Sequence, residues 1–536
     1  MTEFPTFPAT SDLIGWWGRL APHRVALVDR TRDGRHTYGE LDALADEWAA
    51  ALPSLGIGAG DRVATLTGNR VEVIGLFFGA LRVGAALVPL NWRLAAPELA
   101  RVIDDARPAL IVGEERHRSL GEAAVAASGT AARWIDLDHD APAIVAKSRS
   151  TKVVRHRATP DTPAMLLYTS GSTGRPKGAI LPHRQILFNA IATTVGWQIG
   201  AEDVAIVANP FFHTGGWNVF STPVWSRGGR VVLFDQFEPT QFLDAIAEER
   251  VTLAFGVPTQ IGMLTASPSW GRELPSLRFL ISGGAPCPGA LGDRVRAAGI
   301  RFREGYGLTE CGPNCFAITD DEALRRPGAV GWPIPFLEMR IEHRESGGYP
   351  PKVGGGIGKW EKQTAGPVQM PGELLLRGPQ MFGGYFNDPV RTADAVDAEG
   401  WLHTGDLALR DEDGAYRICG RKKDMYISGG ENVFPGEVEA VLSECAGVAE
   451  VVVVGVPDEK WGEVGRAYVV ARPGVDVTAE ELVAHARQRL AGYKVPKLVV
   501  LLEELPRLGS GKPDRRALAD APAGPTVPQG AAATAR

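Results

Sequence analysis

The chain has 536 residues, which is enough for two to four domains that each bury a core of their own. Apolar residues make up 44% and charged residues 22%, which excludes a disordered, collagen-like or coiled-coil protein. The 57 basic and 63 acidic residues give a net charge of −6, so a general attraction to nucleic acid or to anionic membranes is not expected.

The cysteine content and the N-terminal region indicate in which cellular compartment the protein is expected. The 5 cysteines are too few and too scattered for a disulfide framework, which favours a reducing, cytoplasmic location. The first residues lack the basic and apolar regions of a signal peptide. The most apolar long window, from Val71 to Leu90, is interrupted by Glu72 and Arg82, so we expect no integral membrane segment.

Helices and strands are expected to alternate along the N-terminal part of the chain. The pattern predicts helices at Tyr38–Leu52 and Val71–Val83, with a strand at Arg62–Leu66 between them. Further strands are predicted at Ala109–Val112, Val204–Val207, Arg230–Phe234, Leu253–Phe255 and Phe279–Ser282. This alternation is typical of βαβ units, so we expect largely parallel sheets with helices on both faces.

The pattern changes to shorter and more polar strands past about residue 370. Strands are predicted at Gly372–Arg377, Leu407–Arg410 and Ala415–Ile418, followed by a helix at Pro435–Leu442, a strand at Ala449–Val454 and a helix at Ala479–Leu490. The Gly-rich segment Glu345–Gly372 is expected to be a long exposed loop, and Ala521–Arg536 a disordered tail.

The strongest local signal is the run YTSGSTGRPKG at residues 168–178. An apolar stretch leads into this loop, whose backbone N–H groups and hydroxyls can point at phosphate oxygens, with Lys177 as the compensating charge. It is not a Walker loop, because Gly178 rather than Ser or Thr follows the lysine. The expected phosphate-binding residues are Thr169, Ser170, Gly171, Ser172, Thr173, Gly174 and Lys177.

Four further motifs follow in chain order. They are EGYGLTE at residues 304–310, GWLHTGD at 400–406, GRKKD at 420–424 and GSGK at 509–512. With the first motif, this order resembles the adenylate-forming (AMP-binding) superfamily of acyl-CoA synthetases, aryl-CoA ligases, luciferases and peptide-synthetase adenylation domains. Within that superfamily the chain resembles medium- and long-chain fatty acyl-CoA synthetases.

The resemblance implies an α/β fold with two domains. A large N-terminal domain of βαβ-type parallel sheets plus a distorted barrel is followed by a small mobile α+β C-terminal domain. We expect the AMP-binding (adenylation) domain at residues 1–420, the mobile domain at 421–520 and the tail at 521–536. Lys423 matches the family's hinge position, and Gly429, Gly430 and Glu431 match the segment on the CoA side of the active site.

The nucleotide-binding roles follow from the same resemblance. Tyr306 lies between Gly305 and Gly307, so no neighbouring Cβ blocks its ring, and in the family this tyrosine stacks on adenine. Asp406 and Arg421 match positions that bind the ribose hydroxyls. The remaining residues expected at the nucleotide are Gly283, Gly284, Ala285, Glu304 and Thr309.

Catalysis is expected from Lys512, Thr309, Glu310 and His213. Thr309 and Glu310 place a hydroxyl beside a carboxylate, which suits an α-phosphate oxygen and its Mg²⁺, and the expected metal ligands are Thr169 and Glu310. In the family, the lysine that matches Lys512 reaches the α-phosphate from the C-terminal domain. It neutralises charge there as pyrophosphate leaves.

The acid-binding side corresponds to NPFFHTGGW at residues 209–217. Amino-acid-activating members place an Asp after the Phe that aligns with Phe212, but His213 stands there, so a substrate ammonium would be buried without a partner. Trp217 has the spacing of an aromatic gate over an acyl tunnel, or it is a core tryptophan. The other pocket residues expected are Gly256, Val257, Cys311 and Pro313, which suit an uncharged acyl chain.

Together these patterns predict an AMP-forming acyl-CoA ligase, which is an acid–thiol ligase of fatty acid and lipid metabolism. A carboxylic acid, expected to be a medium- or long-chain fatty acid, reacts with ATP and Mg²⁺ to give acyl-AMP and pyrophosphate, and coenzyme A then takes the acyl group. The alternatives are a fatty-acyl-AMP ligase that loads a separate carrier protein, an aryl-CoA ligase, and a catalytically silent nucleotide-binding protein. No nucleic-acid partner is expected, and a homodimer remains open.

Overall fold

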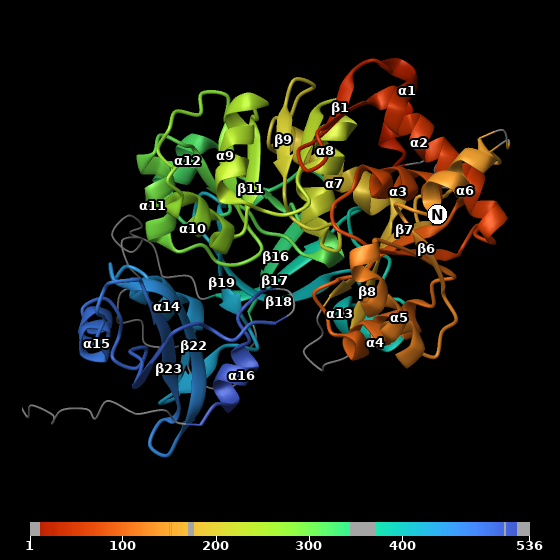
Figure 1. Cartoon of the computed structure of the whole chain (residues 1–536). Helices are drawn as coiled ribbons and strands as arrows, with labels where there is room; N and C mark the ends of the chain where they lie inside the picture. The colour runs from red at the N-terminus through yellow and green to blue at the C-terminus, as the bar shows by residue number, and fades with distance from the viewer. Residues whose placement is uncertain are drawn as a thin grey trace, which may run out of the picture.

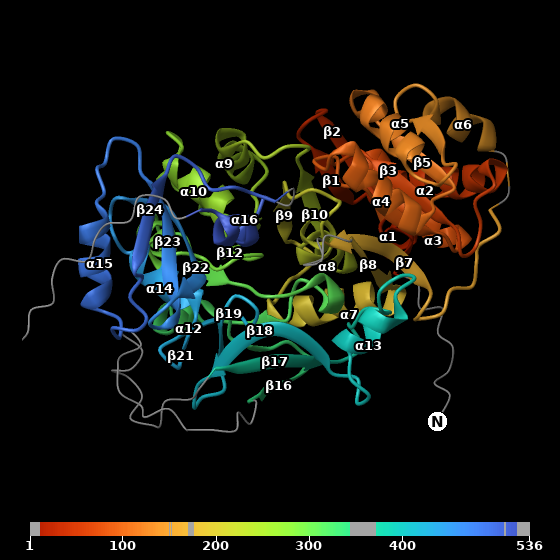
Figure 2. The same ribbon diagram turned by 90° about the horizontal axis from the view of Figure 1, so that it is seen from below.

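The computed structural model describes residues 11–149, 151, 153–169, 176–343, 371–508 and 511–522. Most of the predicted loop at 345–372 and of the tail at 521–536 lies outside these residues. Figures 1 and 2 show a large N-terminal part with a small C-terminal unit beside it. The predicted α/β fold class, with a large N-terminal and a small C-terminal domain, is confirmed.

Two largely parallel sheets form the frame of the large domain. The first has the order β13 (Phe302–Glu304), β12 (Phe279–Ser282), β11 (Leu253–Gly256), β9 (Val204–Val207), β10 (Arg230–Leu233), β1 (Val25–Asp29) and β2 (Gly34–Thr37). The second has the order β6 (Arg133–Asp136), β5 (Leu110–Gly113), β3 (Arg62–Leu66), β4 (Ala86–Pro89), β7 (Pro163–Thr169) and β8 (Lys177–Pro182). In each sheet only the last strand is antiparallel to its neighbour.

Helices cover these sheets, as βαβ connections require. They are α1 (Leu13–Leu20), α2 (Tyr38–Ala51), α3 (Val71–Val83), α4 (Ala96–Ala106), α5 (Arg118–Ala127), α6 (Ala141–Ser148), α7 (His183–Gly196), α8 (Ser221–Ser226), α9 (Pro239–Glu248), α10 (Pro258–Ala266), α11 (Gly289–Ala297), α12 (Asp320–Arg325) and α13 (Pro389–Ala395). Short turns of helix lie at η1 (Leu52–Leu55), η2 (Glu115–His117), η3 (Gly215–Val219) and η4 (Thr309–Cys311). Among the described residues, no helix has the length and apolar character needed to cross a bilayer.

A third, antiparallel sheet has the order β16 (Glu338–Glu342), β17 (Gly372–Arg377), β18 (Leu402–Arg410) and β19 (Tyr416–Arg421). It is accompanied by the short pair β14 (Phe316–Ala317) and β15 (Trp332–Pro333). The strand predicted at Leu407–Arg410 already begins at Leu402, so the GWLHTGD motif lies mostly inside a strand. Asp406 pairs there in register with Arg421.

The C-terminal domain packs helices on a sheet of its own. The strands are β20 (Tyr426–Ser428), β21 (Glu431–Val433), β22 (Val448–Asp458), β23 (Gly462–Ala471) and β24 (Leu498–Leu502). The helices are α14 (Pro435–Leu442), α15 (Ala479–Arg487) and α16 (Arg515–Asp520). A separate apolar cluster fills this domain, and it includes Tyr426, Val453 and Leu482.

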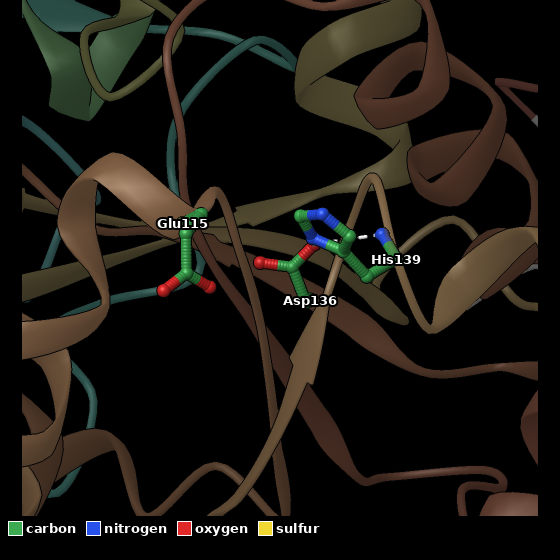
Figure 3. Close-up of side chains that lie close together, drawn as sticks. All are labelled: Glu115, Asp136 and His139. Carbon is green, nitrogen blue, oxygen red and sulfur yellow. Dashed lines mark hydrogen bonds and ion pairs between the residues drawn. The ribbon is translucent and has the colours of Figure 1, made fainter.

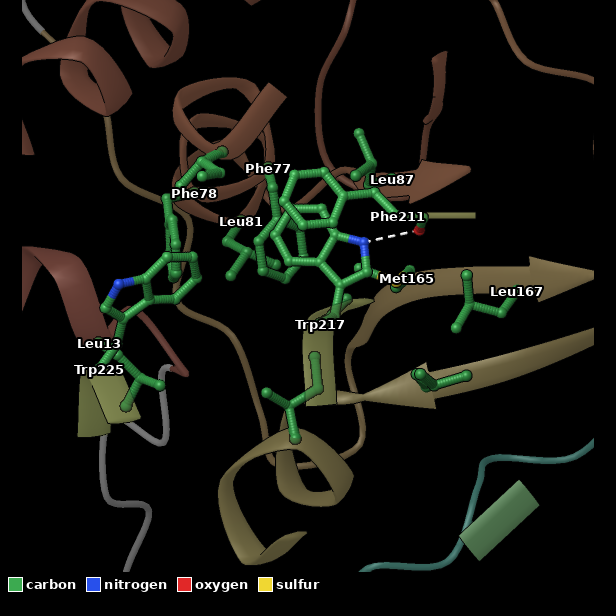
Figure 4. Close-up of a cluster of buried hydrophobic side chains, with 14 of the residues drawn as sticks. Leu13, Phe77, Phe78, Leu81, Leu87, Met165, Leu167, Phe211, Trp217 and Trp225 are labelled. Atoms are coloured by element: carbon green, nitrogen blue, oxygen red, sulfur yellow. Dashed lines mark hydrogen bonds between the residues drawn. The ribbon is translucent and has the colours of Figure 1, made fainter. Parts of the chain in front are cut away.

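The main core of the large domain contains Trp217, whose side chain is completely buried (Figure 4). Its Nε1–H donates to the Phe211 carbonyl at 2.8 Å. Its ring stacks on Phe211 at a centroid distance of 4.2 Å and contacts Phe77 at 4.8 Å. These contacts give Trp217 a structural role in the core, and a gating role in the acyl tunnel stays a prediction.

We predict that Trp217→Ala lowers the free energy of unfolding of the large domain by about 3–5 kcal/mol. The substitution opens a cavity in a packed core and leaves the Phe211 carbonyl without its hydrogen-bond donor. Chemical denaturation followed by circular dichroism measures this change. Trp16→Ala is the matched control, since Trp16 is 59% exposed, and it should shift stability by no more than about 0.5 kcal/mol. Equal shifts for the two variants would contradict the core role.

Candidate active site

The predicted site residues gather at the carboxyl ends of neighbouring parallel strands. Strand β9 leads to His213, β11 to Gly256 and Val257, and β12 to Gly283. Strand β13 ends at Glu304 and leads into the Tyr306 motif. Ligands bind at this edge in open parallel sheets, so the topology collects in one place residues that are far apart in the sequence.

Glycines let the backbone segments at this edge approach one another. A Cβ on Gly307 would lie 2.2 Å from the Pro313 backbone, and a Cβ on Gly305 would lie 2.9 Å from the Ile281 side chain. Gly284 has a φ of +80°, a left-handed backbone conformation that is strained for any residue with a side chain. The Gly305 N–H donates to the Ser282 carbonyl at 2.7 Å. A larger residue would therefore displace a neighbour at Gly305 or Gly307 and would strain the backbone at Gly284.

Tyr306, Asp406 and Arg421 form a hydrogen-bonded chain. The Tyr306 hydroxyl donates to Oδ2 of Asp406 at 2.6 Å, and Nε of Arg421 lies 3.1 Å from Oδ1. Asp406 is only 4% exposed. Burial raises the pKa of Asp406, while Arg421, the Tyr306 hydrogen bond and Lys512 lower it. The structure thus brings together the residues expected at adenine and at ribose.

Lys512 belongs to the C-terminal domain, but its charge acts on the large domain's site. Its side chain is accessible to solvent, yet the protein around it removes enough water to lower its pKa. Arg421 lowers that pKa further, whereas Asp406 and Glu310 raise it. The predicted catalytic lysine therefore lies in the electrostatic field of the expected ribose and metal-binding carboxylates.

His213 lies on the loop between β9 and η3. Loss of hydration, together with the positive charges of Lys512 and Arg93, lowers its pKa to about 4. The imidazole is therefore neutral at pH 7. Its ring contacts Phe212 at a centroid distance of 4.8 Å. A neutral ring beside two cations suits the anionic head of a carboxylic acid rather than an ammonium group.

Asn69 holds the His213 loop in place, and the sequence reasoning missed it. Its Nδ2 donates to the carbonyls of Asn209 (2.9 Å) and Phe234 (3.0 Å), and its Oδ1 accepts from the N–H of Phe211 (2.9 Å). Asn69 is 1% exposed. The sequence feature that could have identified Asn69 is its position, as a polar residue shortly after the buried strand β3 at the carboxyl end of a parallel sheet.

Thr309 and Glu310 lie in the turn η4, which is fixed from two sides. Nε2 of Gln185 donates to the Thr309 carbonyl at 2.8 Å. The Tyr385 hydroxyl donates to Oε1 of Glu310 at 2.8 Å, and Nζ of Lys177 lies 5.0 Å from the centre of the Tyr385 ring. Tyr385 is a second residue that the sequence reasoning missed, because its partners are distant in sequence.

The motif that we expect to bind phosphate is only partly described. Thr169 ends β7 and pairs in register with Lys177, the first residue of β8. The expected residues Ser170, Gly171, Ser172, Thr173 and Gly174 lie outside the described residues. Thr169 and Lys177 therefore mark the two ends of the loop.

The expected acyl-pocket residues show varied environments. Cys311 is fully buried, with its Sγ 3.0 Å from Sγ of Cys315. The Phe255 ring lies near two glycines: its Cε1 would be 3.4 Å from a Cβ at Gly215 and its Cε2 3.3 Å from a Cβ at Gly283. Gly256 and Val257 follow directly after this phenylalanine. Phe255 was not among the predicted residues, and it forms part of the wall beside the His213 loop.

The residues expected at the hinge and on the CoA side lie in two turns. Lys423 belongs to the turn after β19, where the N–H groups of Asp424 and Met425 donate to the Arg421 carbonyl. Gly429 and Gly430 form the turn between β20 and β21, and Glu431 begins β21. The Gly429 N–H donates to the Trp461 carbonyl at 2.8 Å, so this turn packs against its own domain.

Two family descriptions match the sequence. The AMP-binding enzyme family matches residues 15–386, and the AMP-binding enzyme C-terminal domain matches residues 437–512. The chain belongs to the AMP-binding enzyme family. It is 37% identical over 514 residues to feruloyl-CoA synthase from Amycolatopsis sp, covering 93% of this chain and 97% of that protein. It is 35% identical over 510 residues to a long-chain-fatty-acid–CoA ligase from Mycobacterium tuberculosis, covering 93% of this chain and 96% of that protein.

A solved structure resembles this AMP-binding enzyme over nearly its whole length. It is the o-succinylbenzoate CoA synthetase from Bacillus subtilis in complex with an acyl-adenylate intermediate, with a TM-score of 0.83, 28% identity and coverage of 96% of this chain and 99% of that one. The same synthetase has been solved with ATP and a magnesium ion. The predicted superfamily is confirmed, and the chain is an enzyme of the AMP-forming acyl- and aryl-CoA ligase type.

Glu310 suits the Mg²⁺ that the family implies. Its carboxylate is half-buried, one oxygen accepts from Tyr385, and no lysine or arginine of the described chain pairs with it within 4.0 Å. A carboxylate oxygen left free of basic partners is the hard donor that Mg²⁺ prefers. Thr169 supplies a hydroxyl of the same hard type.

Two other groups of possible metal ligands occur in the described part of this AMP-binding enzyme. Glu115, Asp136 and His139 form the first, shown in Figure 3. Nε of Arg118 donates to Glu115 at 2.7 Å, and its Nη2 lies 3.6 Å from Asp136, so a protein cation already balances this group. In the second group, Glu342, Glu373 and His403, Glu373 pairs with Lys422. Both groups are ion-pair networks.

We predict that His213→Gln weakens the pH dependence of stability. The folded pKa of about 4 lies below the ordinary value of 6.5, so the unfolded chain binds a proton that the folded chain does not. Wild-type stability should therefore fall as the pH drops from 6.5 towards 4, and the variant should lose less. Thermal midpoints at pH 7.0, 6.0, 5.0 and 4.5 measure the difference. The same slope for both proteins would contradict a neutral, dehydrated His213.

Proposed function

We propose that this enzyme joins an apolar carboxylic acid to coenzyme A in two half-reactions. In the first, a carboxylate oxygen attacks the α-phosphorus of ATP, giving acyl-AMP and releasing pyrophosphate. In the second, the CoA thiol attacks the acyl carbon, loses its proton, and AMP leaves. The observation that carries the proposal is that the charges of Arg421, Asp406 and Glu310 all act on Lys512 of the C-terminal domain, while Arg421 and Tyr306 bind Asp406.

Each side chain receives a role that its surroundings support. Tyr306 offers its ring to adenine, and Asp406 with Arg421 orients the ribose. Lys512 places its ammonium where negative charge develops on the α-phosphate. Glu310 and Thr169 would hold Mg²⁺, which when bound neutralises phosphate oxygens. The mixed anhydride is itself the activated acyl donor, so no covalent enzyme intermediate is needed.

We further propose that the two domains are joined near residues 420–421 and turn about Lys423. Strand β19 ends at Arg421, and the next strand belongs to the C-terminal sheet. Lys422 pairs with Glu373, and its N–H donates to the Gly405 carbonyl at 2.9 Å, which holds the linker against the large domain. Lys512 faces the site in this arrangement, which suits acid activation. Rotation would bring the turn at Gly429 towards it for thioester formation.

The acid we propose is a medium- or long-chain fatty acid. His213 is neutral, and Gly256 and Val257 are small and apolar, so these three residues offer no charged partner to a distal polar group. An aryl acid is the second candidate, because the Phe255 ring lies beside Gly215 and Gly283, an arrangement that suits stacking on a planar ring. The similarity to feruloyl-CoA synthase supports this second candidate.

A panel of acids, assayed for AMP release and for CoA thioester, tests the substrate class. For a fatty acid we expect kcat/KM to rise about fourfold per methylene through the medium-chain range, since each buried methylene contributes about 0.8 kcal/mol. Faster turnover of ferulate-sized acids would favour the aryl candidate. Preference for acetate, an amino acid or a dicarboxylate would contradict the proposal. Formation of acyl-AMP without CoA thioester would indicate an enzyme that loads a carrier protein. If no acid stimulated AMP release, the chain would be a silent nucleotide-binding protein.

We predict that Lys512→Ala slows adenylate formation by about 10²-fold or more, because it removes the charge that stabilises the α-phosphate in the transition state. Synthetic acyl-adenylate and CoA should still give thioester. Rapid-quench measurement of each half-reaction separates the two effects. Lys147→Ala, at an exposed lysine of α6, is the control and should match the wild type. Equal losses in both half-reactions would contradict the assigned role.

A further inference from the structure

The segment 382–386 connects two parts of the site that are remote in sequence. The Phe382 N–H donates to the Glu310 carbonyl at 2.7 Å. The Gly383 N–H donates to the Ile180 carbonyl at 2.8 Å, and the Phe386 N–H donates to the Gly178 carbonyl at 2.7 Å. One short segment therefore binds both the turn that carries Glu310 and the strand that begins at the phosphate-loop lysine.

Tyr385 makes this connection through its side chain as well. Its hydroxyl donates to Oε1 of Glu310 at 2.8 Å, and its ring faces Nζ of Lys177 at 5.0 Å from the ring centre. The residue is 8% exposed, and the N–H of Tyr385 donates to the Thr392 hydroxyl at 2.9 Å. Both the ring and the hydroxyl are thus fixed by packing.

The Tyr385 hydroxyl occupies one oxygen of the Glu310 carboxylate, because it donates its hydrogen bond to Oε1. The other oxygen has no hydrogen-bond partner within the described residues and faces no competing lysine or arginine within ion-pair distance.

We propose that Tyr385 is a positioning residue for the triphosphate. Its hydroxyl orients the Glu310 carboxylate so that the free oxygen is presented to Mg²⁺, and its ring holds the Lys177 ammonium by a cation–π contact. One side chain then sets the spacing between the metal-binding carboxylate and the phosphate-binding cation. The inference rests on the proposed ATP-dependent activation, and it assigns to Tyr385 no contact with the reacting atoms.

The two contacts of Tyr385 can be separated by substitution. Tyr385→Phe removes the hydroxyl and keeps the ring over Lys177. Tyr385→Leu removes both. Tyr38→Phe is the matched control, because the Tyr38 hydroxyl also donates from a buried position, to the Gly229 carbonyl at 2.7 Å, far from the site in sequence.

Calorimetric titration of the full chain with α,β-methylene-ATP, with and without Mg²⁺, tests the inference without turnover. We expect Tyr385→Phe to weaken binding about tenfold with Mg²⁺ and by less than about twofold without it. We expect Tyr385→Leu to weaken binding in both conditions, since Lys177 loses its ring contact. Tyr38→Phe should keep the wild-type ratio of the two affinities.

A double-mutant cycle with Glu310→Gln identifies the route of the effect. In the Glu310→Gln background, Tyr385→Phe should change the Mg²⁺-dependent affinity by less than about twofold, because the group it positions is already altered. An undiminished effect in that background would overturn the inference, as would a Tyr385→Phe variant that keeps the wild-type Mg²⁺ dependence. Wild-type protein that does not bind the analogue at all would instead contradict the proposed function.

Discussion

The buried carboxylate of Asp406 is the constraint on which the site depends. A carboxylate that is 4% exposed costs free energy unless other groups compensate its charge, and here Tyr306 and Arg421 bind it while Lys512 acts on it from the other domain. Tyr306 comes from the end of a parallel strand, whereas Arg421 is the last residue before the linker. Residues from two distant parts of the sequence therefore meet at one carboxylate, on which the charge of Lys512 also acts.

A second connection lies at Glu310, where Tyr385 links this carboxylate, which we propose as a metal ligand, to Lys177. The charges of both Asp406 and Glu310 raise the pKa of Lys512, so the two carboxylates act on the same ammonium group. Gly305 and Gly307 let the turn that carries Tyr306 pack closely against Ile281 and the Pro313 backbone.

The sequence predicted the elements whose signals are local. The strand at Arg62–Leu66 and the helix at Val71–Val83 appear with the predicted bounds, because a mostly apolar run marks each of them. The start of β18 at Leu402 was missed, since His403, Thr404 and Gly405 interrupt the apolar alternation that marks a strand. Tyr385 and Asn69 were missed because their partners, Glu310 and Phe211, are 75 and 142 residues away, and only the fold brings them together.

The central claim is that the domain arrangement with Lys512 at the site activates the acid before coenzyme A takes part. Exchange of radiolabelled pyrophosphate into ATP tests this most directly, using the full chain with Mg²⁺ and a long-chain acid and leaving CoA out. The account predicts exchange that depends on the acid and proceeds without CoA. Exchange that requires CoA, or cleavage of ATP to ADP and phosphate in place of pyrophosphate release, would contradict it.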